Sequence, residues 1–91
     1  MGKVIVTLKI MPVSPDVNLD TIKSSATDLI EGFNAQLAKT EIEPVAFGLK
    51  ALLLTIVFDE SRGSSDSLEE QIKEIDGVQS CEAISVRRAL G

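Results

Sequence analysis

Alternation of apolar and polar positions begins almost at the start of the chain. In residues 3–11 an apolar side chain stands at every second position from Val4 onward, and many of these residues are β-branched. A period of two is typical of a β-strand, so we predict a first strand here. Pro12 and Pro15 end it, because proline lacks a backbone N–H and fixes φ.

A helical period follows. Apolar residues recur at steps of three and four, with polar residues between them: Leu19, Ile22, Ala26, Leu29, Ile30 and Phe33. This spacing predicts an amphipathic helix. We expect Asn18 to be its N-cap, Asp20 to favour its first turn, and Gly32 to end it.

Three strands and a second helix fill the rest of the chain. Residues 35–43 read as a poorly patterned edge strand, and residues 49–58 as a central strand that is apolar on both faces. Residues 59–65 are polar and predict a loop. Ser67 and Glu70 fit a capping box that opens a short helix with Leu68, Ile72 and Ile75 on its buried side. Residues 78–88 predict a last strand, with Ile84 and Val86 facing inward.

The order β-α-β-β-α-β indicates an α+β, ferredoxin-like domain spanning residues 1–91, with both helices on one face of a four-stranded antiparallel sheet. The expected strand order is fourth, first, third, second. The open face would carry apolar residues of the first and third strands, such as Ile5 and Leu53. We leave two hypotheses open for that face, a partner surface or a partly apolar face of a stable sheet.

Composition excludes several chemistries. The 91 residues carry a net charge of −5, no histidine and one cysteine, Cys81. The negative charge argues against binding a phosphate backbone, and the missing histidines remove Ser-His and Cys-His catalysis. Glu41 and Glu43 share a strand face, but an exposed edge explains them better than a catalytic pair. We expect that the chain is not an enzyme and binds no cofactor. We expect Cys81 to be a small, partly buried strand residue.

Two features lack a packing explanation. Segment 44–50 (PVAFGLK) places a large aromatic, Phe47, beside Gly48 in a turn between strands. An exposed aromatic there would be an interface anchor, and a Phe tucked under its own sheet is the alternative. Arg87 and Arg88 end the last strand of an acidic chain. The alternative to a functional role for this pair is a basic end that only aids solubility.

These residues carry a resemblance to archaeal translation elongation factor 1-beta. The matching segments are KIMP (9–12), SPD (14–16), NL (18–19), EPVAFGLKAL (43–52), GVQS (77–80) and VRR (86–88). The chain therefore resembles that family over nearly its whole length, without the N-terminal domains of eukaryotic relatives.

The resemblance implies a function. Family members bind the GDP form of the GTPase elongation factor 1-alpha and speed nucleotide release. It implies that Phe47, with Pro44 and Gly48, lies against the partner's second domain. It also implies that Arg88, or as second choice Arg87, matches a lysine that eukaryotic relatives place near the partner's Mg²⁺ and phosphates. A cytoplasmic protein that is monomeric on its own is expected.

Two other functions compete with this one. A ligand-sensing regulatory module of the same fold would dimerise through its sheet and bind an amino acid in a glycine-lined site. An acylphosphatase-like enzyme would need a phosphate-cradling loop with an arginine after the first strand, where this chain has PVSP (12–15).

Overall fold

The computed structural model describes residues 2–89 and contains every element that the sequence predicts. The elements follow the chain as β1 (Lys3–Pro12), α1 (Leu19–Gly32), β2 (Gln36–Pro44), β3 (Lys50–Asp59), the short 3₁₀ helix η1 (Glu60–Arg62), α2 (Asp66–Lys73) and β4 (Val78–Ala89). The Asn18 side chain caps α1 as expected, accepting the N–H of Asp20 at 2.8 Å. The polar segment predicted as a loop contains η1, whose N-cap is Asp59.

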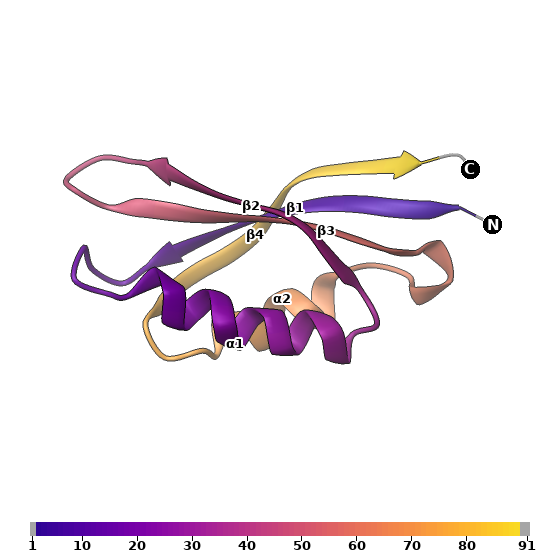
Figure 1. Cartoon of the computed structure of the whole chain (residues 1–91), viewed down its shortest axis with the longest axis horizontal. Helices are drawn as coiled ribbons and strands as arrows, with labels where there is room; N and C mark the ends of the chain where they lie inside the picture. The colour runs from indigo at the N-terminus through magenta and orange to yellow at the C-terminus, as the bar shows by residue number, and fades with distance from the viewer. Residues whose placement is uncertain (1, 90–91) are drawn as a thin grey trace.

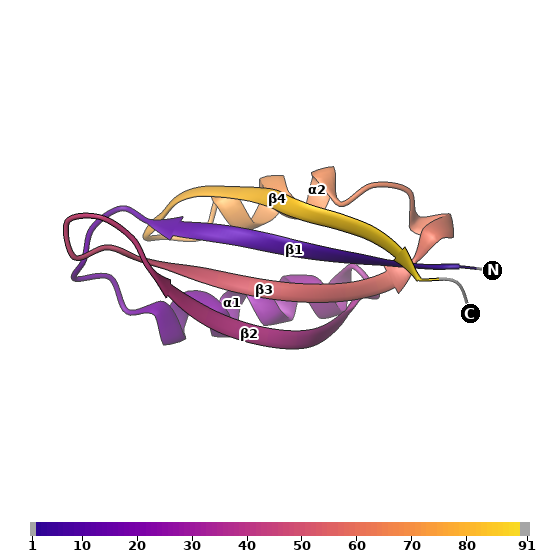
Figure 2. The same ribbon diagram turned by 90° about the horizontal axis from the view of Figure 1, so that it is seen from above.

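One antiparallel sheet organises the molecule. Its strand order is β2-β3-β1-β4, which confirms the predicted fold and order. Both helices pack against the same face of this sheet (Figure 1). Seen from above, α1 lies beneath β2 and β3, whereas α2 lies on the β4 side (Figure 2).

The core lies between the sheet and the helices. Alternate residues of the two central strands are fully buried, including Leu8 and Leu54, and Ile22 and Ile30 of α1 pack against them. Phe58 closes the core near α1 with an edge-to-face contact to Phe33, their ring centroids 5.4 Å apart. The two-residue period of the strands and the 3.6-residue period of the helices thus converge on a single apolar layer.

The last strand differs from the prediction that Ile84 and Val86 face inward. Both side chains are exposed, Ile84 by 51% and Val86 by 63%. The register shifts at this point, because Ser85 pairs with Thr7 and Ala83 with the next residue of β1, which leaves Ile84 unpaired in a β-bulge. Val86 does lie opposite the buried Val6, but the short α2 does not reach far enough to cover it.

The start of α2 also differs from the prediction. Its N-cap is Ser65, not Ser67, and Ser67 lies within the helix. The buried Ser65 hydroxyl donates a hydrogen bond to the Glu69 carboxylate at 2.7 Å and does not accept one from the backbone. Ser67 has a glutamate three residues on, as a capping box requires, whereas Ser65 has Leu68 at that position and Glu69 four residues on. The local pattern therefore favours Ser67, and the burial of Ser65 decides against it.

The open face of the sheet carries polar side chains among its apolar ones. Ile5 and Leu53 are half-buried, and Lys9 lies between strands β3 and β4 at the level of Leu53. Thr7 and Thr55 bring their hydroxyl oxygens within 3.3 Å of each other on the same face. The side chain of Lys9 reaches Glu43 at 3.8 Å. Polar groups therefore divide this face, and both hypotheses about it remain predictions.

The strands are longer than the helices that cover them. A ten-residue strand spans about 33 Å, whereas α1 and α2, with 14 and 8 residues, span about 21 Å and 12 Å. The molecule is correspondingly elongated, at 42 × 21 × 17 Å. Both ends of the sheet consequently extend past the helices, and the segments singled out in the sequence lie there.

Two neighbouring leucines test this description of the core. Leu54→Ala should lower the free energy of unfolding by about 2–5 kcal/mol, because a fully buried side chain leaves a cavity. Leu53→Ala, on the half-buried open face, should cost clearly less. Urea unfolding of both variants measures this. Equal losses would contradict the assignment of the two faces.

Candidate functional site

The β2–β3 hairpin presents Phe47 to solvent. Its side chain is 94% exposed, so the alternative that it tucks under its own sheet is wrong. The turn is closed by the N–H of Leu49, which donates to the carbonyl of Ala46 at 3.1 Å, and by the N–H of Val45, which donates to the carbonyl of Leu49 at 2.8 Å. An aromatic ring is thus fixed at the tip of a hydrogen-bonded turn, with nothing of its own chain over it.

The backbone at this tip is strained. Phe47 has φ +59° and Gly48 has φ +77°, the pattern of a type I′ turn, which ordinarily takes Asn-Gly. Glycine adopts this conformation freely, but a bulky residue does so at a cost in free energy. A residue that is both strained and exposed adds nothing to folding, which favours a function for Phe47.

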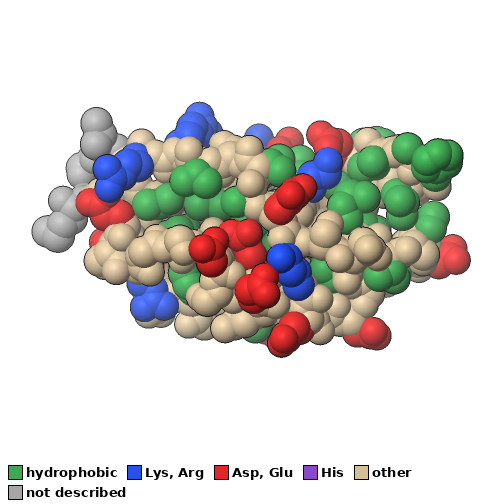
Figure 3. All heavy atoms as spheres, turned by 180° about the vertical axis from the view of Figure 1, so that it is seen from behind, with side chains coloured by type: hydrophobic (Ala, Val, Ile, Leu, Met, Phe, Trp, Pro, Cys, Tyr) green, Lys and Arg blue, Asp and Glu red, His purple; other side chains and the backbone are tan. Residues whose placement is uncertain are grey.

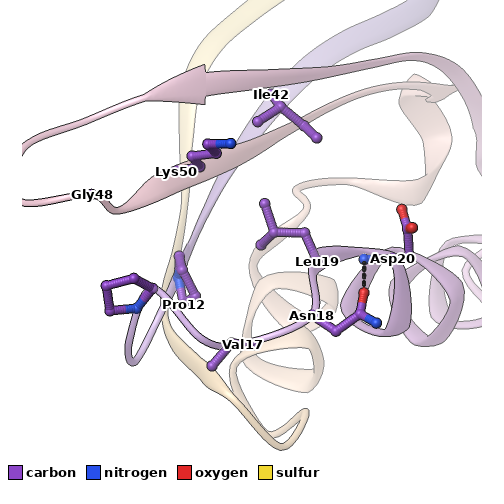
Figure 4. Close-up of a pocket in the computed structure, with 9 residues that line it drawn as sticks. Pro12, Val17, Asn18, Leu19, Asp20, Ile42, Gly48 and Lys50 are labelled. Atoms are coloured by element: carbon purple, nitrogen blue, oxygen red, sulfur yellow. Dashed lines mark hydrogen bonds between the residues drawn. The ribbon is translucent and has the colours of Figure 1, made fainter.

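Beside the hairpin lies a hollow of about 350 Å³ (Figure 4). It separates the hairpin from the loop between β1 and α1. Its lining residues come from both sides: Pro12, Pro15, Val17, Asn18, Leu19, Asp20, Ile42, Gly48 and Lys50. The local pattern of β1 and α1 gave no sign that their junction would meet the hairpin. The tertiary structure adds this junction to the candidate surface.

The two arginines lie at the other end of the sheet and on opposite faces. Arg87 pairs with Ile5 and shares the open face, whereas Arg88 pairs with Val4 and lies on the helix side. The Nη2 atom of Arg88 is 2.6 Å from a carboxylate oxygen of Glu60. Arg87 has no ion pair within residues 2–89. Glu60 was missed by the sequence analysis, since nothing in a polar loop indicates which distant cation it meets.

The hairpin and the arginines are not brought together. The residues that pair along β1 and β3 place about eight strand positions between Arg88 and Pro44, or roughly 26 Å along the sheet. The hairpin tip and the two termini lie at opposite ends in Figure 1. Hydrophobic side chains gather toward the hairpin end, and acidic ones lie over the middle (Figure 3). The candidate site therefore consists of two separate ends of one rigid sheet.

The other candidates show no sign of a reactive site. Glu41 and Glu43 are exposed, and each has a lysine nearby, Lys39 and Lys9 respectively. Residues 2–89 contain no group of three or more acidic or cysteine side chains that could hold a metal ion. No helix in the same range has the length and apolar character needed to cross a membrane.

Cys81 is buried on the helix side of β4, opposite Ile10. Burial, with a smaller contribution from the nearby Glu69 carboxylate, raises the pKa of its thiol to about 12. The thiolate is the reactive form, so this group is inert near neutral pH. The expected packing role of Cys81 agrees with this environment.

Comparison with known proteins gives the family. The EF-1 guanine nucleotide exchange domain matches residues 5–89. The chain belongs to this family. It is 41% identical to elongation factor 1-beta of Methanothermobacter thermautotrophicus, over 99% of this chain and 100% of that protein. The elongation factor 1-beta proteins of Methanobrevibacter smithii and Methanococcus aeolicus are 40% and 38% identical, over 99% and 94% of this chain and 100% and 97% of theirs.

Solved structures resemble this exchange domain in fold alone. The ACT domain of a GTP pyrophosphokinase from Chlorobium tepidum superposes with a TM-score of 0.60 at 16% identity, covering 88% of this chain and 96% of that domain. The designed protein Foldit4 gives a TM-score of 0.63 at 17% identity, covering 98% of each chain. These likenesses support the α+β sandwich and carry no function.

The environment of Cys81 predicts its reactivity. The native exchange domain at pH 8 should not react with a disulfide reagent such as DTNB, because the thiol pKa of about 12 leaves almost no thiolate and the group is buried. In guanidinium chloride one equivalent should react quickly, since the unfolded thiol regains its ordinary pKa. Rapid reaction of the native protein would contradict the burial of Cys81.

Proposed function

We propose that this chain is a guanine-nucleotide exchange factor that promotes GDP release and GTP loading on the elongation factor 1-alpha GTPase. Membership of the EF-1 guanine nucleotide exchange domain family supports the activity, and the names of the archaeal relatives point to the translation factor as partner. A role in elongation also fits a cytoplasmic location. The partner is recognised by a protein surface, and no bond is made or broken on this chain.

The exposed, strained Phe47 is the observation that carries the proposal. A tip residue of this kind gives a partner a rigid aromatic anchor that loses little conformational entropy on binding. Phe47 would insert into a pocket on the second domain of the GTPase, with Pro44 and Gly48 packing beside it. The hollow next to Gly48 leaves room for a partner side chain on the same surface.

Arg88 at the other end would act on the nucleotide. A cation brought near the partner's Mg²⁺ and phosphates competes with the metal ion and weakens the grip on GDP. By linkage, GDP and Mg²⁺ must weaken the binding of the exchange factor to the same extent. The distance between the two ends fits this division, since one end would hold one domain of the partner while the other reaches its nucleotide site.

Substitution of Phe47 tests the anchor. Phe47→Ala should weaken binding to the GDP-bound GTPase by roughly 30-fold, the loss typical of a hot-spot residue. The stability of the free protein should not fall, because the ring contacts nothing of its own chain. Isothermal titration calorimetry measures the affinity. Ile84→Ala is the control, since Ile84 is also apolar and exposed but lies away from the hairpin on β4, and an equal loss in that variant would argue against a specific anchor.

Substitution of Arg88 tests the nucleotide end. Arg88→Ala should lower the rate of GDP release at saturating exchange factor by about tenfold or more, because a hydrogen bond to a charged group is lost. Affinity for the GTPase should change much less. Stopped-flow release of a fluorescent GDP analogue measures both quantities.

Three variants sharpen the assignment of this end. Arg88→Lys keeps the charge and should retain much of the rate if a compact cation is enough. Arg87→Ala tests the second candidate, and Lys39→Ala removes an exposed cation from the middle of the sheet. Normal release rates in both arginine variants would refute the role of this end, even if wild-type protein accelerates release.

A further inference from the structure

Glu60 connects three parts of the sheet at the end that carries Arg88. One of its carboxylate oxygens accepts the Arg88 Nη2 group at 2.6 Å. The other accepts the backbone N–H of Gly2 at 3.3 Å, and the N–H of Glu60 itself donates to the Gly2 carbonyl at 3.1 Å. A single residue directly after β3 thus contacts both Gly2, which precedes β1, and Arg88, near the end of β4.

The backbone around Glu60 holds it in place. It opens η1 directly after β3, and the preceding Asp59 caps this helix by accepting the N–H of Ser61 at 2.9 Å. Gly2 lies so close that a Cβ atom there would come within 3.3 Å of the Glu60 carboxylate. The position of Glu60 therefore does not depend on Arg88, and the carboxylate can serve as a fixed point for a mobile side chain.

This contact orients Arg88 but leaves most of its hydrogen-bond donors free. A guanidinium group has five N–H donors in a planar fork, and the Glu60 contact engages one terminal nitrogen. The Arg88 side chain remains 73% exposed, whereas that of Glu60 is 38% exposed. Donors are left over for a second anionic group that approaches from solvent. Arg87, on the other face, has no comparable restraint among the residues that the structure describes.

We infer that Glu60 is a positioning residue for Arg88, which holds the guanidinium at the end of the sheet so that its free donors meet the phosphates of the nucleotide. The inference rests on the proposed exchange function and adds to it a residue on a different segment. Restraint before binding lowers the entropy that a long side chain loses when it is ordered in the complex. The opposite effect, masking of the Arg88 charge by Glu60, predicts a rate change of the opposite sign.

The exchange assay tests whether removing Glu60 lowers or raises the rate of GDP release. Glu60→Ala should slow GDP release by about three- to fivefold at saturating exchange factor, the range open to an exposed ion pair. Glu60→Gln keeps an oxygen acceptor and should lose less. Glu70→Ala is the matched control, because it also removes an exposed glutamate from an ion pair, the 2.9 Å pair with Lys73, and its rate should equal that of wild type.

A double-mutant cycle of Glu60 and Arg88 distinguishes a positioning role of Glu60 from a general effect of lost charge or stability. In an Arg88→Ala background, Glu60→Ala should have no further effect on the rate, because the residue that it orients is gone. Thermal melting shows whether each variant remains folded at the assay temperature. Faster release in Glu60→Ala, a rate equal to wild type, or a full additional loss in the double variant would each overturn the inference.

A measurement on the free protein keeps this test independent of the exchange activity. The heteronuclear NOE of the Arg88 Nε–H group should fall in Glu60→Ala and stay unchanged in Glu70→Ala, since a restrained side chain becomes mobile. If wild-type protein fails to accelerate release, the exchange function is refuted, while the NOE still reports on the restraint. An unchanged NOE in Glu60→Ala would overturn the positioning role whatever the exchange assay gives.

Discussion

The pairing of β1 with both of its neighbours is the interaction on which the rest of the structure depends. Lys3 pairs with Asp59 on one side and with Ala89 on the other, so the ends of three strands lie at the same level. This register brings Glu60 and Arg88 together from positions 28 residues apart in the chain. It also places the β2–β3 hairpin at the far end, beyond the cover of the helices.

The buried core and the proposed contact residues occupy different lengths of the same sheet. The middle is covered by two helices and contains the buried core, where each side chain is selected for packing. The ends of the sheet extend past the helices. One end carries a strained aromatic and the other a paired arginine, and neither side chain helps to bury apolar surface. A rigid core between two exposed ends would suit the proposed exchange function, in which the two ends contact two parts of one partner at a fixed separation.

Local charges matter more here than the net charge of −5. The acidic total argues against nucleic acid as a partner, yet the end of β4 carries two arginines on opposite faces. Only one of them, Arg88, has a carboxylate partner among residues 2–89. That partner comes from a separate segment, so the direction in which a cation is presented is a property of the folded sheet and not of the sequence near the C-terminus.

Short-range patterns in the sequence determined the elements and their order, because side-chain periods of 2 and 3.6 and prolines act over a few residues. The handedness of the β-α-β crossovers then gave the strand arrangement. They also singled out Phe47 and the arginine pair. The capping residue of α2 and the faces of β4 were decided only by tertiary structure. Ser67 fits the capping box by its local pattern, but the helix begins after the buried Ser65 instead. The bulge at Ile84 shifts the alternation, so that Cys81 and Arg88 both lie on the helix side. The contact of Arg88 with Glu60 depends on that shift, which places Arg88 on the helix side. The bulge itself arises from the pairing of β4 with β1, and no local sequence pattern encodes that pairing.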